Sequence, residues 1–152
     1  GDHPGMPKVA VDYAHTPDAL DKVLAALSKQ VPKQLICIVG CGGNRDQGKR
    51  PEMARVVARW ADRVWFTSDN PRDEDPDSIL QDMLSGLTTQ QQRSVCVEQN
   101  RADAIAQAIQ SAGSEDVILI AGKGHESTQE IAGTKYPFSD AEVVREFMKE
   151  NA

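Results

Sequence analysis

A glycine-dense segment over residues 40–50, with the sequence GCGGNRDQGKR, has the composition of an anion-binding loop. It follows an apolar run over residues 35–39 and precedes a helical pattern. Glycines at such a junction let backbone N–H groups approach an anion, and the N-terminus of the helix adds positive potential. The alternative is a tight turn with solvated charges. We favour the anion loop because the segment also carries three cations, Arg45, Lys49 and Arg50.

The spacing Gly43-xxxx-Gly48-Lys49 imitates the phosphate loop of nucleotide hydrolases. In that loop a Ser or Thr follows the lysine and binds Mg²⁺, whereas this chain has Arg50. The sequence therefore predicts an anion loop that lacks a Mg²⁺ ligand. We assign no metal site, since Cys37 and Cys41 lack a second pair of ligands. We also assign no catalytic residue.

A second polar cluster, Asp69-Asn70-Pro71-Arg72, has the donors and acceptors to bind a zwitterionic amino acid. The carboxylate of Asp69 can bind an ammonium group, while Asn70 and Arg72 can bind a carboxylate. Pro71 restricts the backbone between them. Taken alone, the cluster is more typical of an Asx-type turn than of a binding site.

Two further segments contain titratable side chains. Asp12 and His15 follow a predicted strand, where a histidine commonly has a structural role. The run 122–126, with the sequence GKGHE, combines a cation, a base and an acid in a loop that its glycines allow to approach a ligand. Its alternative is a bulge at the end of a strand.

These polar segments must be positioned by the elements between them. β-branched runs predict strands over residues 9–13, 35–39, 63–67, 95–98 and 116–121. Capping signals and apolar periodicity predict helices that begin near residues 17, 51, 76, 101 and 140, the last with a capping box of Ser139 and Glu142. We expect residues 88–93 to form a solvated loop and the segment that ends at Pro137 to be irregular.

This alternation predicts an α/β, Rossmann-like fold, with a mostly parallel sheet of about six strands and helices on both faces. Ligands of such sheets bind beyond the carboxyl ends of the strands. Each of the four polar segments follows a predicted strand, so we expect them to converge on one site.

The composition sets limits on the class of protein. At 152 residues the chain is long enough for one domain, and its formal net charge of −6 argues against a nucleic-acid or membrane-surface partner. We find no run long enough to span a membrane and no signal-peptide pattern. The three cysteines are typical of reduced residues in the cytosol. The first residue is not Met, and the first predicted strand follows closely, as expected of an excised domain.

In their order along the chain, the four segments resemble the C-terminal domain of the Mur ligases, from residue 9 to the end. The Asp69-Asn70-Pro71-Arg72 motif is similar to the one that distinguishes members adding meso-diaminopimelate from members adding L-lysine. The resemblance implies that residues 1–152 form the C-terminal domain of a three-domain, ATP-dependent amide ligase of peptidoglycan precursor synthesis in the bacterial cytoplasm. ATP, Mg²⁺ and the UDP-N-acetylmuramoyl-dipeptide would bind mainly to the other two domains. We therefore expect the isolated chain to be an inactive monomer without a cofactor of its own.

The resemblance also implies roles for individual residues. Arg72, Asn70 and Arg45 would bind the carboxylates of diaminopimelate, and Asp69 and Glu126 its ammonium groups, beside Pro71 and Gly122. Asp12, His15 and Lys49 would face the nucleotide and its phosphates. Two alternatives remain open: a related folate ligase, which the Asp69-Asn70-Pro71-Arg72 motif argues against because glutamate lacks a second ammonium group, and a stand-alone anion-binding or regulatory module.

Overall fold

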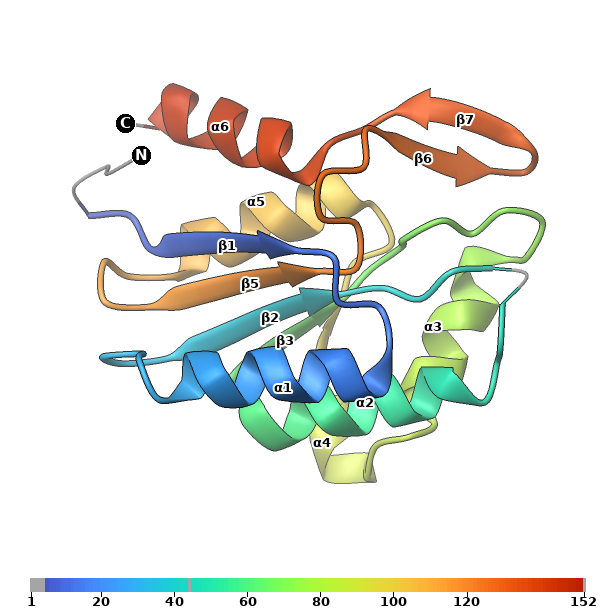
Figure 1. The fold of residues 1–152 in the computed structure, drawn as a ribbon, viewed down its shortest axis with the longest axis horizontal. Coiled ribbons are helices and arrows are strands. Elements are labelled where there is room, and N and C mark those ends of the chain that lie inside the picture. The colour runs from blue at the N-terminus through green and yellow to red at the C-terminus, as the bar shows by residue number, and fades with distance from the viewer. Residues whose placement is uncertain (1–4, 44, 152) are drawn as a thin grey trace.

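The chain forms an α/β fold around a five-stranded parallel sheet, seen in a computed structural model that describes residues 5–43 and 45–151 (Figure 1). The strand order is β1-β5-β2-β3-β4. The strands are β1 (Lys8–Asp12), β2 (Leu35–Val39), β3 (Arg63–Phe66), β4 (Cys96–Val97) and β5 (Val117–Ala121). The predicted fold class is confirmed, but the sheet has five strands rather than about six.

Helices cover both faces of the sheet, as predicted (Figure 1). The helices α1 (Pro17–Ser28), α2 (Lys49–Trp60) and α4 (Thr89–Ser94) lie below the sheet in this view, and α3 (Pro76–Leu84) lies to the right of it and packs against α2. The helices α5 (Arg101–Ser111) and α6 (Asp140–Asn151) lie above it. The predicted caps form at three helices: the side chains of Thr16, Asn100 and Ser139 accept hydrogen bonds from the backbone of α1, α5 and α6.

Strand β2 shows how one sheet supports two cores. All five of its residues are buried, and successive side chains of a strand point to opposite faces. Leu35, Cys37 and Val39 join the cluster that α1 and α2 cover. Ile36 and Ile38 join the cluster under α5 and α6. A strand buried on both faces must be continuously apolar, which is why this run was readable from the sequence.

Two segments differ from the sequence-based prediction. Residues 88–93 fall within or next to α4 instead of forming a loop, because Thr88 and Gln91 make a reciprocal capping box. The segment before Pro137 is not irregular but forms an antiparallel hairpin of β6 (Thr128–Ile131) and β7 (Thr134–Pro137). Its turn residues, Ala132 and Gly133, have φ values of 50° and 79°. Such a turn usually carries an Asn-Gly or Asp-Gly signal, which is missing here.

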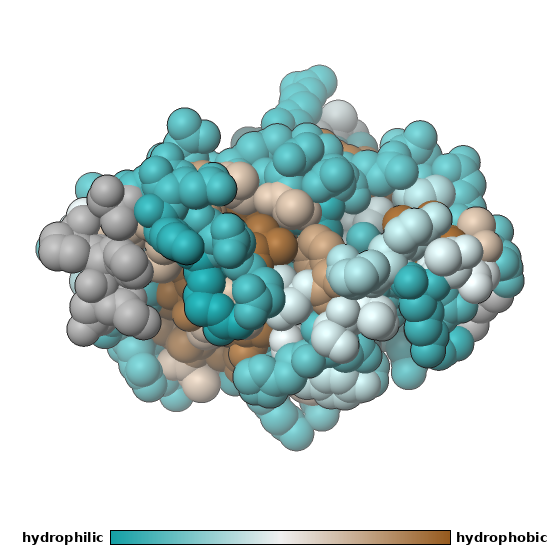
Figure 2. Space-filling model, turned by 90° about the horizontal axis from the view of Figure 1, so that it is seen from above, coloured by the Kyte–Doolittle hydropathy of each residue, from teal (hydrophilic) through white to brown (hydrophobic). Residues whose placement is uncertain are grey.

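The hairpin and α6 occupy the upper side of the molecule (Figure 1). From above, polar ridges surround a smaller apolar surface (Figure 2). Among the described residues, no helix is both long and apolar enough to span a membrane.

Candidate functional site

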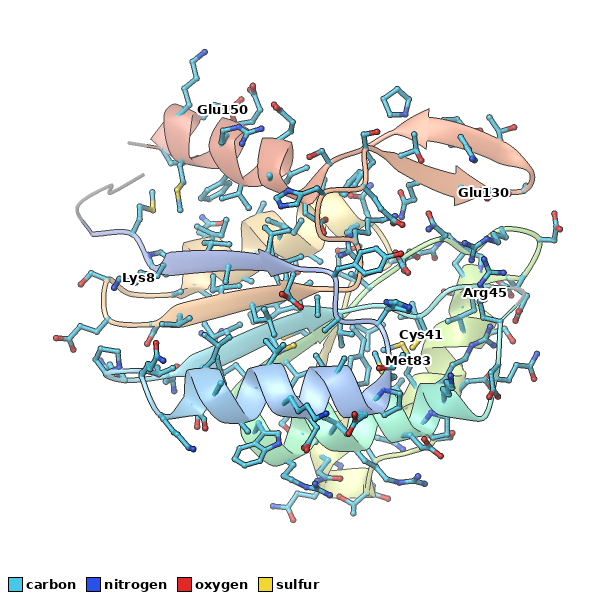
Figure 3. The ribbon with its side chains drawn as sticks, viewed as in Figure 1. Lys8, Cys41, Arg45, Met83, Glu130 and Glu150 are labelled. Atoms are coloured by element: carbon cyan, nitrogen blue, oxygen red, sulfur yellow. The ribbon has the colours of Figure 1, made fainter. Side chains whose placement is uncertain are left out.

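A pocket of about 460 Å³ lies at the carboxyl edge of the sheet. Residues after β1, β2, β3 and β5 line it, so the four polar segments converge as predicted. Cys41 and Arg45, on the loop between β2 and α2, lie on the same side of the molecule as Glu130 of β6 (Figure 3). The lining consists of Tyr13, His15, Thr16, Gly40, Cys41, Gly42, Arg45, Asp46, Lys49, Arg50, Met53, Asp69, Asn70, Arg72, Gly122 and Glu126.

Most of the predicted site residues line this pocket, and two do not. Pro71 is buried and lines a separate hollow together with Ser68, and Asp12 lines a neighbouring cavity together with Tyr13 and Glu126. The Asp12 carboxylate accepts a hydrogen bond from the N–H of Ala14 at 2.9 Å, so it shapes the turn after β1. The ligands of these residues stay predictions. Sequence reasoning missed Tyr13, Cys41, Asp46 and Met53 as lining residues.

Two glycines of the loop after β2 allow it to pack against the loop after β3. A Cβ atom on Gly43 would lie 1.8 Å from the carbonyl oxygen of Pro71, and one on Gly40 would lie 2.5 Å from that of Thr67. The Gly43 N–H donates to the Asn70 carbonyl at 2.7 Å. The N–H of Gly43 is therefore occupied by a backbone carbonyl. Part of the glycine content of this loop thus serves the packing of two loops instead of anion binding. Asn44 of the same loop lies outside the described residues.

Arg50 is not the pocket cation that the sequence suggested. Its side chain is 1% exposed, and its guanidinium forms ion pairs with Glu74 at 2.8 Å and Asp82 at 2.9 Å. The hydrogen bonds to Glu74 raise the pKa of Arg50 in spite of burial. Arg50 occupies the position at which a phosphate loop has its Mg²⁺-binding hydroxyl. The glycine-dense loop after β2 therefore does not fit Mg²⁺. Arg45 and Lys49 are the exposed cations in the pocket lining.

The backbone of Arg72 is held in a conformation that few non-glycine residues adopt, with φ at 52°. Its N–H donates to the carbonyl of Glu130 at 3.0 Å, so β6 restrains it. Its Nη1 donates to the Gly43 carbonyl at 2.9 Å, and Nε lies 3.6 Å from a carboxylate oxygen of Glu130. Among the described residues none binds Nη2, which leaves that donor for a ligand. The role of Glu130 could not be predicted from sequence.

Lys123 connects the polar residues of two loops. Its side chain is fully buried, and Nζ lies 3.0 Å from Asn70 Oδ1, 3.2 Å from Asp69 Oδ1 and 3.8 Å from Glu126 Oε1. The two carboxylates that we expect to bind ammonium therefore already share a protein cation. Gly122 and Gly124, with φ values of 115° and 55°, allow the loop to bring Lys123 inward.

The thiol of Cys41 lines the pocket, but we expect it to be unreactive. Burial, and next the charge of Asp69, raise its pKa to about 12, and burial raises that of Cys37 equally. Cys96 is exposed. Iodoacetamide at pH 8 should therefore modify Cys96 well before the other two, as followed by peptide mass spectrometry. Modification of Cys41 as fast as Cys96 would contradict this.

The same thiols should make stability depend on pH. Unfolded cysteine loses its proton near pH 9, whereas these folded thiols keep theirs to about pH 12. The folded state thus binds more protons in this window, and the free energy of unfolding should fall as the pH rises from 9 to 12.

The fold and the four converging loops define an α/β domain with a ligand pocket at the carboxyl edge of its parallel sheet, and comparison with known proteins gives its family. Residues 2–124 match the model of the Mur ligase, glutamate ligase domain. The chain belongs to this family. It is similar to the UDP-N-acetylmuramoyl-L-alanyl-D-glutamate–2,6-diaminopimelate ligase of Xylella fastidiosa, with 54% identity over 95% of this chain and 29% of that protein. The ligase of the same name from Acidovorax is 58% identical over 90% of this chain and 27% of that protein.

Solved structures agree with this membership. A structure of a UDP-N-acetylmuramoyl-L-alanyl-D-glutamate–2,6-diaminopimelate ligase matches 99% of this chain and 32% of its own, with a TM-score of 0.90 and 40% identity. A bifunctional folylpolyglutamate synthase/dihydrofolate synthase matches with a TM-score of 0.56 and 20% identity, over 76% of this chain and 26% of that one, which shows the fold alone. The chain spans less than a third of the length of the curated relatives described here.

Proposed function

We propose that this chain is the C-terminal, amino-acid-binding domain of a ligase that adds meso-diaminopimelate to UDP-N-acetylmuramoyl-L-alanyl-D-glutamate in peptidoglycan precursor synthesis. The relatives that match nearly the whole chain carry this activity in their names. The observation that supports it most is the charge pattern of the pocket. Two carboxylates, Asp69 and Glu126, line the same pocket as two guanidinium groups, Arg45 and Arg72. That pattern is complementary to an amino acid with ammonium and carboxylate groups at both ends.

The reaction requires activation of a carboxylate, which is a poor electrophile. In the proposed reaction ATP phosphorylates the D-glutamyl γ-carboxylate and releases ADP. The amine of diaminopimelate attacks the acyl phosphate, a tetrahedral intermediate forms, and an amide forms as inorganic phosphate leaves and the amine loses a proton. This domain would contribute by holding the amine close to the acyl carbon, which accelerates the reaction through proximity and orientation.

The individual roles follow from charge and geometry. Nη2 of Arg72 and the amide of Asn70 would donate to the far carboxylate, and Arg45 to a carboxylate as well. Asp69 and Glu126 would accept from the ammonium groups. Lys49, at the first residue of α2, and His15 would face phosphate or nucleotide, with Asp12 supporting the turn beside them.

The remaining substrates would bind to other domains of the intact protein. Because Arg50 replaces the Mg²⁺-binding hydroxyl, we propose that ATP and Mg²⁺ are held by a central domain and the uridine nucleotide by an N-terminal one. We further propose that the protein is a cytoplasmic monomer, with its three cysteines reduced.

A folate ligase of the same fold is the second candidate. It would have to bind glutamate, which has one ammonium group where the pocket offers Asp69 and Glu126. Lys123 already neutralises part of the charge of these two carboxylates. The number of carboxylates therefore does not by itself separate a diaminopimelate ligase from a folate ligase. The identity to diaminopimelate ligases, 54% compared with 20% for the folate enzyme, favours the first proposal.

The proposed function can be tested by substrate dependence in the intact protein. Phosphate release should require ATP, the UDP-linked dipeptide and an amino acid together, and it should be fastest with meso-diaminopimelate. Comparable rates with lysine would contradict the specificity. A requirement for glutamate and a pteroate in place of these substrates would establish the folate alternative.

The 152-residue chain alone should be inactive. It lacks a Mg²⁺-binding phosphate loop in its described part, so the purified chain should release no phosphate above background when given ATP, Mg²⁺ and both other substrates. A colorimetric phosphate assay, with the intact protein as positive control, measures this. Turnover by the isolated chain would show that an ATP site exists within it.

A further inference from the structure

Lys123 is a buried cation for which the proposed reaction has no direct use. Its ammonium group donates hydrogen bonds to Asn70 Oδ1 at 3.0 Å and to the Thr128 carbonyl at 3.1 Å. It also forms an ion pair with Asp69, whose Oδ1 lies 3.2 Å away without making a hydrogen bond. Glu126 lies slightly farther away, at 3.8 Å. A lysine with no exposed side-chain surface is rare unless it is paired in this way.

One consequence is a fixed orientation of the Asn70 side-chain amide. Its Oδ1 accepts from Lys123 Nζ and also from the N–H of Glu130 at 2.8 Å. Both partners are donors, so only the oxygen of the amide can face them. The Nδ2 group then lies at the opposite end, and it has no hydrogen-bond partner among residues 5–43 and 45–151. Because Asn70 lines the pocket, this orientation leaves a donor for a ligand carboxylate.

A second consequence concerns charge. Without Lys123, the carboxylates of Asp69 and Glu126 would place a formal charge of −2 beside the pocket. With Lys123 the cluster carries a formal charge of −1, which one ammonium group of a ligand neutralises. The protein thus contains a cation that limits how many ammonium groups this part of the pocket attracts.

We infer that Lys123 is a positioning residue for amino-acid binding: it orients the amide of Asn70 toward the ligand carboxylate and halves the charge of the Asp69–Glu126 pair. The inference rests on the proposed function for its ligand, but the orientation of Asn70 does not. The competing explanation is that Lys123 only joins the loops after β3 and β5 and supports the fold.

The first test observes Asn70 directly in the 152-residue chain. The side-chain amide signals of Asn70 are identified in an ¹⁵N-resolved NMR spectrum by their loss in Asn70→Ala. Lys123→Met should shift these signals and broaden them as the amide samples a second orientation, while thermal melting confirms that the variant is folded. Lys149→Met, which changes an exposed lysine of α6, should leave them in place. Unchanged Asn70 signals in folded Lys123→Met would overturn the inference.

The second test separates positioning from general support with a double-mutant cycle. Binding of meso-diaminopimelate is followed by NMR titration. Lys123→Met should weaken binding by about tenfold or more when Asn70 is present. In the Asn70→Ala background the same change should cost less than about threefold, because the oriented donor is already gone. Equal losses in both backgrounds would show that Lys123 does not act through Asn70.

The inference can still be tested if the Lys123→Met variant does not fold or if the wild-type chain does not bind the ligand. If Lys123→Met does not fold, the wild-type chain still shows whether the Nζ protons of Lys123 exchange slowly and contact Asn70 and Thr128; fast exchange without such contacts would overturn the inference. If the wild-type chain binds no meso-diaminopimelate, the proposed function loses its support, whereas the Asn70 amide signals still decide the role of Lys123.

Discussion

Replacing Arg72 with alanine in the intact ligase is expected to raise the KM for meso-diaminopimelate by at least about tenfold and to narrow its advantage over lysine. The two amino acids differ by one carboxylate at the far end of the side chain. A charge-assisted hydrogen bond to that group contributes about 1.5–3 kcal/mol. When lysine binds instead, the donor at Nη2 loses its partner, which disfavours lysine further.

The ratio of kcat/KM for the two amino acids is the informative quantity. Arg72 also binds the Gly43 carbonyl, so its loss should loosen the pocket for both substrates equally. Only the contact with the far carboxylate should change the ratio. Arg93→Ala, at an exposed arginine of α4, provides the matched control and should change neither constant. A ratio that Arg72→Ala leaves unchanged would remove the specificity role from this residue.

Replacing Arg101 with methionine is expected to lower the free energy of unfolding by about 3–5 kcal/mol. Arg101 and Asp140 are both fully buried and form a two-point ion pair, with distances of 2.7 and 2.8 Å. The guanidinium also donates to the carbonyls of Ser68 and Ala121, each at 3.2 Å. Burial disfavours its charge, but the hydrogen bonds and charge of Asp140, together with the charges of Asp69 and Glu126, outweigh burial and raise the pKa of Arg101. Methionine would leave a buried, unpaired carboxylate.

Urea unfolding of the 152-residue chain measures this effect. The double variant Arg101→Met with Asp140→Leu should recover much of the loss, since replacing a whole buried pair by apolar groups is often close to neutral. A cost below about 1 kcal/mol for Arg101→Met alone would show that the pair is unimportant for stability. Because Arg101 joins the ends of β3 and β5 to α6, a large cost would also identify it as support for the pocket edge.

The features that were predictable from sequence are those that local patterns determine. The apolar run of β2, the cap at Thr16 and the cap at Asn100 each depend on neighbours within a few residues. The convergence of the four polar segments was also predictable, because all parallel strands end at the same edge of their sheet. The family resemblance then supplied roles for residues that the pattern alone left ambiguous.

Features that depend on distant partners could not be predicted. Arg50 resembled a ligand-binding cation because its partners, Glu74 and Asp82, lie far along the chain and follow a different strand. Lys123 resembled an ordinary loop cation for the same reason, as its contact with Asn70 spans 53 residues. The hairpin of β6 and β7 was missed because its strands are mostly polar, with β6 only partly buried and β7 exposed, so no alternation marks them.

Direct binding to the 152-residue chain tests the central claim, that this pocket recognises meso-diaminopimelate. Titration with meso-diaminopimelate, L-lysine and L-glutamate, by calorimetry or NMR, compares three ligands that differ in the groups the pocket contacts. We expect meso-diaminopimelate to bind about tenfold more tightly than lysine, and glutamate to bind most weakly. Signals of Asn70, Arg72 and Glu126 should shift together on binding. Glutamate binding as tightly as meso-diaminopimelate, or lysine binding equally well, would contradict the claim.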